Sequence, residues 1–336
     1  MKKITLLRAN KTKFGGAENY LLRLTKEFEK QNIECEVVNS TAPKFLSSWI
    51  KAVWFNLQVC LNKKHKFYFS LERVSCPDIY RAGDGVHKEF LKTKKRRFNP
   101  LNIVYLYLEK RCFENSKKII ANSNMIKKQI IKTYNIEPKK IEVIYNGIEI
   151  KPLQNFTCIQ KEFNLKDEKI ILYVGSGFER KGVKEAIKIV SKLKNRVKLI
   201  IIGKEKNISY YKNLANSLHV DTIFTGVRSD VDKFYSMGDI FLFPTHYEPF
   251  SNVVLEAMSF KNVVITTKQN GAHEILDNKY IMQTPQDYSI VKKIDELLKD
   301  NKKLEAVKKQ NLGIVQNFTI EKNAKETMKI INEHLN

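Results

Sequence analysis

The stretch Pro244-Thr-His-Tyr-Glu248-Pro-Phe-Ser-Asn-Val-Val-Leu-Glu256-Ala-Met258 carries the clearest structural signal in the sequence. An apolar run over residues 240–243 ends directly before it and has the length of a buried strand. A helical pattern begins near Ser251, where Ser251 or Asn252 can cap the first turn. A strand, a polar turn and a helix in this order form the repeating unit of a parallel α/β sheet, which binds ligands beyond the carboxyl ends of its strands.

Two carboxylates flank the start of this helix. Glu248 precedes it, and Glu256 falls among Val254, Leu255 and Ala257, where a charge is costly without hydroxyl or cationic partners. A helix N-terminus binds phosphate, and carboxylates accept hydrogen bonds from hydroxyls. The pair therefore indicates a ligand that carries both groups, such as a nucleotide sugar. The alternative is that Glu248 is only a turn residue and Glu256 only an exposed helix residue.

Alternating short apolar runs and helical patterns continue on both sides of this stretch. They predict an α/β fold with two doubly wound Rossmann-like domains that face a central cleft, the default site for a ligand. The polar segment 151–169 is the expected linker, between an N-terminal domain over residues 1–165 and a C-terminal domain over residues 166–336. The expected strands are 4–8, 33–39, 118–121 and 141–145 in the first domain and 170–174, 198–202, 222–225, 240–243 and 263–266 in the second.

A glycine-containing turn follows the first expected strand of each domain. Gly175-Ser-Gly-Phe-Glu-Arg180-Lys181-Gly182 has nearly the spacing of a phosphate loop, but Val183 stands where that loop needs lysine, so NTP hydrolysis is not expected. Arg180 and Lys181 are instead placed to neutralise a diphosphate, unless they form only a solvated basic loop. Phe14-Gly15-Gly16-Ala17-Glu18 lets the backbone approach an anion or forms only a tight turn, and it lacks the Gly-x-Gly-x-x-Gly pattern of dinucleotide sites.

The chain of 336 residues is strongly basic, with a formal net charge of +24. The first 150 residues carry 30 basic and 14 acidic side chains, and residues 88–118 hold ten basic and three acidic ones, interleaved with aromatic residues. Such a surface attracts anionic lipid or nucleic acid through counterion release, although a well-solvated surface has the same composition. The surplus of lysine over arginine also fits compositional drift, so charge alone does not choose among these interpretations.

The sequence contains no run of 18 apolar residues, which argues against a transmembrane helix. Arg8 interrupts the apolar run after the start, so no signal peptide is expected. Five cysteines without a Cys-x-x-Cys pair predict free thiols in a reducing compartment. The expected location is the cytoplasm, with peripheral association to the inner face of the cytoplasmic membrane.

Together these motifs resemble glycosyltransferase family 4, whose hallmark is a pair of glutamates separated by seven residues, as Glu248 and Glu256 are. The resemblance covers nearly the whole chain, and residues 78–87 and 175–183 are similar in particular to bacterial lipopolysaccharide-core glucosyltransferases. It implies the GT-B fold, with an acceptor-binding N-terminal domain, a donor-binding C-terminal domain and a last helix that packs back on the N-terminal domain. It also implies retention of the donor's anomeric configuration, and no metal ion or other cofactor. Further segments that carry it are 14–18, 121–123, 144–148, 237–244 and 270–274.

Carried over position by position, the resemblance implies a role for each candidate residue. Glu256 holds the ribose hydroxyls of the donor, and Glu248 holds the hydroxyls of the donor sugar. The transferred sugar and the acceptor hydroxyl lie near Asp84 and His87, so that Asp84, His87 and Glu248 form the expected catalytic set. The remaining expected donor-binding residues are Gly15, Gly16, Arg180, Lys181, Lys204 and Lys206 at the diphosphate, Val227 and Arg228 at the base, and Pro249, Phe250, Ser251 and Asn252 in the turn after Glu248.

Two positions depart from or complicate the family pattern. The family often has Gly and Pro shortly after the second glutamate, where this chain has Phe260-Lys261-Asn262-Val263, so we expect a local change in a turn. Asp230-Val-Asp232 matches the Asp-x-Asp metal motif of other glycosyltransferases. Because it follows a strand and opens a helix, helix capping is the favoured interpretation.

The predicted function is transfer of a hexose, glucose by resemblance, from a UDP-sugar to a lipid-linked saccharide such as the lipopolysaccharide or lipooligosaccharide core. Basic and aromatic side chains between Lys44 and Lys118 are expected to dock the enzyme on an anionic membrane surface. Two alternatives remain open. A basic, non-catalytic nucleic-acid-binding protein explains the charge but not Glu248 and Glu256, and a nucleotide-sugar epimerase shares the two-domain architecture.

Overall fold

A computed structural model of the chain describes residues 3–10, 16–94, 99–153, 157–165 and 168–335. These form two compact units, one of Met1–Gly147 with Ile320–Asn336 and one of Ile148–Thr319. Each unit contains a six-stranded parallel sheet with connecting helices, which confirms the predicted α/β class with two doubly wound domains. The division after Gly147 lies ahead of the boundary expected at residue 165.

The first unit has the strand order β2-β1-β3-β4-β5-β6. Side-chain caps mark two of its helix starts: Asn99 accepts from the Leu101 N–H with Pro100 at the first helical position, and Ser123 accepts from the Ile126 N–H. The strands are β1 (Lys3–Leu7), β2 (Glu34–Val38), β3 (Tyr68–Ser70), β4 (Ile79–Ala82), β5 (Lys118–Ala121) and β6 (Ile141–Val143). The helices are α1 (Gly16–Lys30), α2 (Ser48–Leu61), α3 (His87–Leu91), α4 (Pro100–Asn115), α5 (Asn124–Tyr134) and α14 (Ile320–His334), with a 3-10 turn at Pro138–Lys140.

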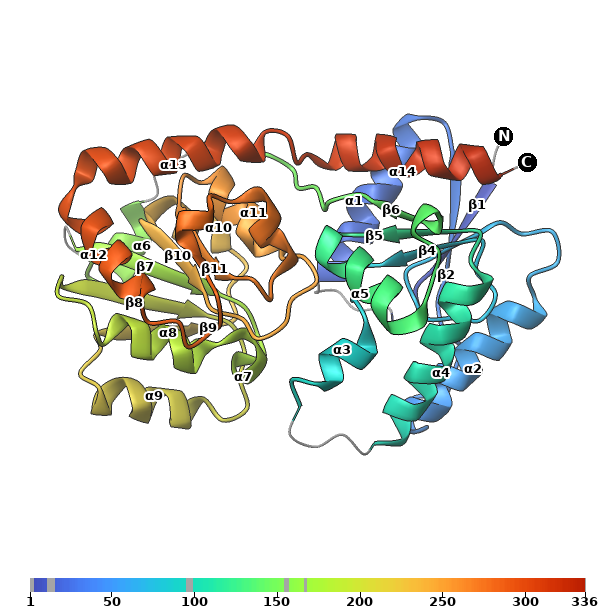
Figure 1. Cartoon of the computed structure of the whole chain (residues 1–336), viewed down its shortest axis with the longest axis horizontal. Coiled ribbons are helices and arrows are strands. Elements are labelled where there is room, and N and C mark those ends of the chain that lie inside the picture. Colours follow the sequence, from blue (N-terminus) through green and yellow to red (C-terminus); the bar gives the residue numbers. More distant parts are fainter. Residues whose placement is uncertain (1–2, 11–15, 95–98, 154–156, 166–167, 336) are drawn as a thin grey trace. The chain divides into compact units, whose positions relative to one another are not determined.

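Helix α14, formed by the end of the chain, belongs to the core of this first unit and runs beside α1 (Figure 1). Its residues Ala324, Met328 and Ile331 are buried in one cluster with Leu24 and Phe28 of α1. Buried hydrogen bonds add to this packing. The Tyr20 hydroxyl donates to Asn323 Oδ1 at 2.8 Å, and Asn323 Nδ2 donates to the Tyr145 carbonyl at 2.6 Å. The core of the first unit is therefore completed by a segment that follows the entire second unit in the sequence.

The second unit has the strand order β12-β11-β10-β7-β8-β9. Successive strands β7, β8 and β9 extend in one direction from β7, and the later strands start again on its other side at β10. The strands are β7 (Lys169–Val174), β8 (Val197–Ile202), β9 (Thr222–Gly226), β10 (Ile240–Phe243), β11 (Val263–Thr267) and β12 (Ile281–Met282). The helices are α6 (Thr157–Glu162), α7 (Phe178–Lys181), α8 (Val183–Val190), α9 (Ile208–Ser217), α10 (Val231–Met237), α11 (Asn252–Ser259), α12 (Ile290–Lys299) and α13 (Asn301–Val315), with 3-10 turns at Gly271–Ile275 and Asn278–Tyr280. The strand order reverses between the neighbouring strands β7 and β10. Their carboxyl ends therefore mark a topological switch point, where ligands of such sheets bind.

The cysteines correct one prediction. Cys60 of α2 and Cys76 form a disulfide, so the expectation of free thiols is wrong for this pair, while Cys35 and Cys112 are free as predicted. The pair closes because α2 packs beside the segment that leads into β4, a tertiary contact that cysteine spacing does not reveal. No helix within the described residues is both long and apolar enough to span a bilayer.

The turn after α11 shows how the chain replaces the glycine and proline of the family pattern. Lys261 adopts a φ of +60°, a conformation that glycine accepts and most side chains avoid. The buried Asn262 side chain closes the turn, since its Nδ2 donates to the carbonyls of Tyr235 and Ala257 at 2.8 and 3.1 Å. In this chain the turn is therefore closed by hydrogen bonds of the Asn262 side chain, where the family pattern has the rigid ring of proline.

Lys261→Gly is expected to stabilise the protein. Relief of the left-handed strain is worth about 1–2 kcal/mol, and the extra freedom of glycine in the unfolded chain removes about half of it. We expect a melting temperature about 2–3 °C higher in calorimetry. The matched control is Lys268→Gly, at an exposed lysine without a positive φ, which is expected to lower the melting temperature. Equal losses in both variants would show that the turn is not strained.

Candidate functional site

Three side chains predicted from the sequence meet at the switch point of the second unit. Arg180 and Lys181 end α7, in the loop after β7, and Glu248 lies in the loop after β10. Arg180 Nη1 lies 3.0 Å and Lys181 Nζ 3.6 Å from Glu248 Oε2. Because β7 and β10 are hydrogen-bonded neighbours, their carboxyl-terminal loops are brought to one place. The result is a carboxylate with two cations at the edge of the sheet where ligands bind.

Glycine makes this close approach of the two loops possible. Gly182 has a φ of +80°, and a Cβ there would lie 1.9 Å from the carbonyl oxygen of Pro244. Hydrogen bonds then join the loops: the His246 N–H donates to the Arg180 carbonyl at 2.9 Å, and Arg180 Nη1 donates to the Tyr247 carbonyl at 2.6 Å. Arg180 is thus oriented by the backbone of the loop that carries Glu248.

Glu248 is held ionised by its surroundings. Burial acts to raise its pKa, but the charges and hydrogen bonds of Lys181 and Arg180 outweigh burial and leave the pKa below its usual value. Both cations approach Oε2, and within the described residues neither a hydrogen bond nor an ion pair reaches Oε1. The second oxygen can therefore accept a hydrogen bond from a ligand hydroxyl while the first remains neutralised.

The loop after β8 lies directly against the loop after β7. Gly203 allows this contact, because a Cβ on it would stand 2.1 Å from the Gly175 carbonyl oxygen. The Lys204 N–H donates to Ser176 Oγ at 2.9 Å, and the Gly177 N–H donates to the Lys204 carbonyl at 3.3 Å. Lys204 and Lys206, the predicted diphosphate lysines, are exposed in this loop. Their backbone is fixed beside the Arg180 loop, while their side chains are exposed to solvent.

Glu256, the second carboxylate of the pair, lies in α11 and is half-buried. The hydroxyl of the fully buried Tyr235 donates to Glu256 Oε2 at 3.4 Å, a partner that sequence reasoning missed. Ser251 occupies the N-cap position of α11, but its side chain makes no capping hydrogen bond, which corrects the expectation that it caps the helix. In the same turn, Pro249 and Phe250 are buried.

The predicted base-binding segment follows β9. Val227 exposes 71% of its surface. The Arg228 side chain, in contrast, is held by ion pairs with two carboxylates. Its guanidinium pairs with Glu162 at 2.8 Å and with Asp230 at 2.9 Å. Asp230 is the N-cap residue of α10, but its side chain makes no capping hydrogen bond. The prediction that it caps the helix is therefore wrong, and its carboxylate pairs with Arg228 instead. The backbone of this segment and the exposed Val227 side chain remain available to a ligand.

The candidates in the first unit lie in the turn between β4 and α3. Asp84 is about half exposed, and His87, the first residue of α3, is buried with its Nε2 3.1 Å from Asn102 Oδ1. Burial and the charge of Arg73 lower the pKa of His87, so its imidazole is neutral at neutral pH. Gly16 is the first residue of α1, and Gly15 lies outside the described residues.

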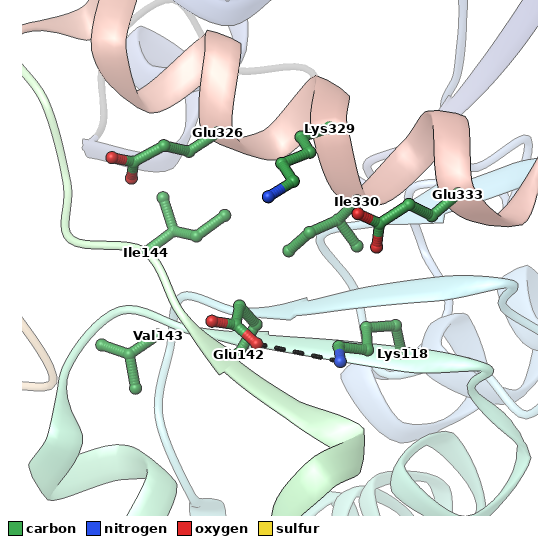
Figure 2. A pocket seen from close by; sticks show the side chains of 8 residues that line it. All are labelled: Lys118, Glu142, Val143, Ile144, Glu326, Lys329, Ile330 and Glu333. Carbon is green, nitrogen blue, oxygen red and sulfur yellow. Dashed lines mark ion pairs between the residues drawn. The ribbon is translucent and has the colours of Figure 1, made fainter.

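One hollow of the first unit, of about 360 Å³, contains none of the predicted residues (Figure 2). It lies between α14 and the strands β5 and β6, and its lining combines charged side chains of both signs with Val143, Ile144 and Ile330. Its lining residues are Lys118, Glu142, Val143, Ile144, Glu326, Lys329, Ile330 and Glu333. Within the described residues, no group of three or more His, Cys, Asp or Glu side chains is arranged to hold a metal ion.

Comparison with known proteins gives this architecture a family. The profile described as "Glycosyl transferases group 1" matches residues 155–312, and that described as "Glycosyltransferase Family 4" matches residues 78–151. The structure of WaaG, a glycosyltransferase involved in lipopolysaccharide biosynthesis, matches with a TM-score of 0.83 at 18% identity, covering 98% of this chain and 99% of that one. The two parallel sheets therefore form a GT-B-type fold. The chain belongs to the group 1/family 4 glycosyltransferases, as its motifs predicted.

Two further matches bear on ligands. A Campylobacter jejuni protein, named N-acetylgalactosamine-N,N'-diacetylbacillosaminyl-diphospho-undecaprenol 4-alpha-N-acetylgalactosaminyltransferase, is 26% identical over 245 residues, 70% of this chain and 65% of that protein. The structure of Anabaena Alr3699/HepE in complex with UDP-glucose matches with a TM-score of 0.77 at 16% identity, covering 99% of this chain and 100% of that one. The matches span between 45% and 65% of the length of three curated relatives, the Campylobacter jejuni protein among them.

Proposed function

We propose that the chain transfers a hexose, glucose in the first instance, from a UDP-sugar to a lipid-linked saccharide such as the lipopolysaccharide core. The observation that carries this proposal is the contact of Arg180 and Lys181 with Glu248 at the switch point of the second unit. The UDP-glucose complex of HepE supports the choice of donor. The Campylobacter jejuni relative, named for transfer to a diphospho-undecaprenol-linked sugar, supports a lipid-linked acceptor.

In this proposal each group of the cluster has a distinct task. Glu248 Oε1 accepts hydrogen bonds from the donor sugar, which orients the anomeric carbon. The bond from that carbon to the diphosphate oxygen breaks while a bond to the acceptor hydroxyl oxygen forms, and the hydroxyl proton passes to the departing diphosphate. Arg180, Lys181 and the exposed Lys204 and Lys206 stabilise the negative charge that grows on the diphosphate. Glu256 binds the ribose hydroxyls.

Glu256→Gln is expected to weaken donor binding and leave folding intact. Hydrogen bonds from ribose hydroxyls to a carboxylate contribute about 1.5–3 kcal/mol, so their loss should raise the dissociation constants of UDP and UDP-glucose about 10- to 150-fold. Titration calorimetry with UDP, GDP, ADP, UDP-glucose and UDP-N-acetylgalactosamine measures the effect and the base and sugar preference. The same titration with EDTA tests the expected independence from metal.

Glu305→Gln, at an exposed carboxylate of α13, is the matched control and should bind donor as the unaltered protein does. Absence of nucleotide binding by the unaltered protein would contradict the proposal. Epimerised nucleotide sugar as the product of UDP-glucose alone, detected by NMR, would favour the epimerase. Steeply salt-dependent RNA binding without UDP affinity would favour the nucleic-acid-binding alternative.

We further propose that the first unit docks on anionic membrane through the α2–α4 surface, defined as Phe45, Trp49, Trp54, Leu57, Leu61, Ile103 and Tyr107. All of these side chains are exposed although they are large and apolar, and they belong to α2, to the residues just before it, and to α4, which packs beside it. Lys44, Lys51, Lys110 and Arg111 lie in the same segments. Exposed tryptophan and leucine beside lysine are typical of surfaces that insert into the headgroup region of a bilayer.

The double variant Phe45→Ser, Leu61→Ser is expected to reduce binding to phosphatidylglycerol vesicles at least tenfold, because each side chain loses about 1 kcal/mol or more of partial burial in lipid. Co-sedimentation with vesicles measures it. Leu22→Ser, at a similarly exposed leucine of α1 outside the α2–α4 surface, is the control and should bind normally. Equal binding of all three proteins would show that charge alone attracts them, or that nothing docks here.

A further inference from the structure

Arg73 and Glu109 form a buried ion pair in the first unit, separate from the donor-binding residues proposed above. The Glu109 side chain is fully buried, the Arg73 side chain is 8% exposed, and Arg73 Nε donates to Glu109 Oε1 at 2.9 Å. Removing two charges from water costs about as much as their attraction returns, so such a pair adds little net stability. The contacts that the two side chains make with their surroundings indicate a different role.

Arg73 holds one end of the turn between β4 and α3. Its Nη2 donates to the Gly85 carbonyl at 3.3 Å, and its Nη1 lies 3.8 Å from Asp84 Oδ2. Asp84 is about half exposed, so Arg73 approaches this carboxylate from the protein interior. A rigid guanidinium can satisfy several such acceptors at once because its N–H groups point in fixed directions.

Glu109 holds the other end of the same turn. Its Oε1 accepts a hydrogen bond of 2.7 Å from the His87 N–H, at the first residue of α3, and its Oε2 accepts one of 2.6 Å from the Tyr134 hydroxyl of α5. The carboxylate thereby fixes where α3 begins. Asp84 and His87, the catalytic residues expected in this unit from the sequence, lie on either side of Gly85 and are anchored through one ion pair.

The residues that support this arrangement lie on one face of helix α4. Asn102, Tyr105 and Glu109 are spaced three and four residues apart and therefore share one face of the helix. Asn102 contacts the His87 ring, and Tyr105 packs edge-on against it with 5.3 Å between centroids. The Arg73 guanidinium lies 5.5 Å from the centroid of the same Tyr105 ring. Helices α3 and α4 are packed neighbours.

We infer that Arg73 and Glu109 are positioning residues that hold Asp84 and His87, the catalytic residues expected in the first unit, in a fixed geometry. The inference rests on the proposed function, since it assumes that Asp84 and His87 take part in the transfer reaction. Neither Arg73 nor Glu109 touches the substrate. Loss of their geometry should slow the chemical step and leave nucleotide affinity unchanged, because the groups proposed to bind UDP belong to the second unit.

The test uses the double variant Arg73→Met, Glu109→Gln, which removes both charges and keeps an acceptor for the His87 N–H. We expect a melting temperature close to that of the unaltered protein, an unchanged dissociation constant for UDP, and at least a tenfold lower kcat for UDP release from UDP-glucose with water as acceptor. Arg73→Lys keeps the positive charge but lacks the several fixed N–H donors of the guanidinium. Its kcat should lie between that of the double variant and that of the unaltered protein. The control is Lys139→Met, at an exposed lysine of the first unit that pairs with Glu137 at 2.7 Å, and it should leave kcat unchanged.

An unaltered kcat in a folded double variant would overturn the inference. Should the double variant fail to fold, Arg73→Lys decides alone: a kcat equal to that of the unaltered protein overturns the inference, and a lower kcat with unchanged UDP affinity supports it. Failure of the unaltered protein to bind UDP or to release it from UDP-glucose would instead contradict the proposed function, so the two failures are distinguishable.

Discussion

Gly182→Ala is expected to lower the free energy of unfolding of the second unit by about 4 kcal/mol or more, because both sterics and backbone conformation oppose it. The added Cβ would stand 1.9 Å from the Pro244 carbonyl oxygen, a backbone atom that cannot rotate away. The φ of +80° adds left-handed strain. Relief requires the loop after β10 to move, and that loop carries Glu248.

Gly177→Ala separates these two causes. Gly177 has nearly the same φ, +78°, but a Cβ there would meet nothing within 4 Å. We expect a loss of only about 1–2 kcal/mol, seen as a melting temperature lower by about 2–8 °C, against 10 °C or more for Gly182→Ala. Calorimetry of both variants with and without UDP measures stability and donor binding together. Similar losses in the two variants would mean that the close approach of the loops is not required.

Arg180→Gln is expected to reduce kcat/KM for UDP-glucose about 10²- to 10³-fold, the usual cost of losing one fixed donor that stabilises a developing negative charge. The variant also removes the 3.0 Å contact with Glu248 and the hydrogen bond to the Tyr247 carbonyl. Lys181 still lies 3.6 Å from Glu248, so that carboxylate is not left without a cation and the protein should fold.

Steady-state UDP release with UDP-glucose as donor measures this effect. Lys184→Gln, at an exposed lysine of α8, removes the same charge from the same part of the unit and should change kcat/KM less than twofold. A comparable loss in both variants would show that Arg180 acts only through the net charge of the surface. Unchanged kinetics of Arg180→Gln would remove Arg180 from the proposed site.

The meeting of Arg180, Lys181 and Glu248 could be anticipated because it depends on local signals. Each residue lies in a turn that directly follows a strongly apolar strand, and parallel strands end at the same edge of a sheet. The expected strands of the second unit differ from the observed ones by a residue or less at each end. These strands could be located from the sequence because they are buried on both faces, and such strands appear as continuous apolar runs.

Other features could not be anticipated because they depend on tertiary contacts or on short elements. Strand β3 has three residues, too few to show a period, and β4 contains the buried Arg81, which disrupts its apolar pattern. The pairing of Arg228 with Glu162 joins positions 66 residues apart. The same holds for the contacts of Tyr235 with Glu256 and of Arg73 with Glu109: their partners become neighbours only after the helices pack.

The position of α14 has a consequence for the order in which the protein forms as it is synthesised. The second unit is continuous in sequence, so it can fold as soon as residue 319 has left the ribosome. The first unit is translated earlier but lacks Ala324, Met328 and Ile331 of its core until the last helix emerges. Its incomplete apolar surface is then exposed throughout translation of the second unit, which makes this half the expected client of ribosome-associated chaperones.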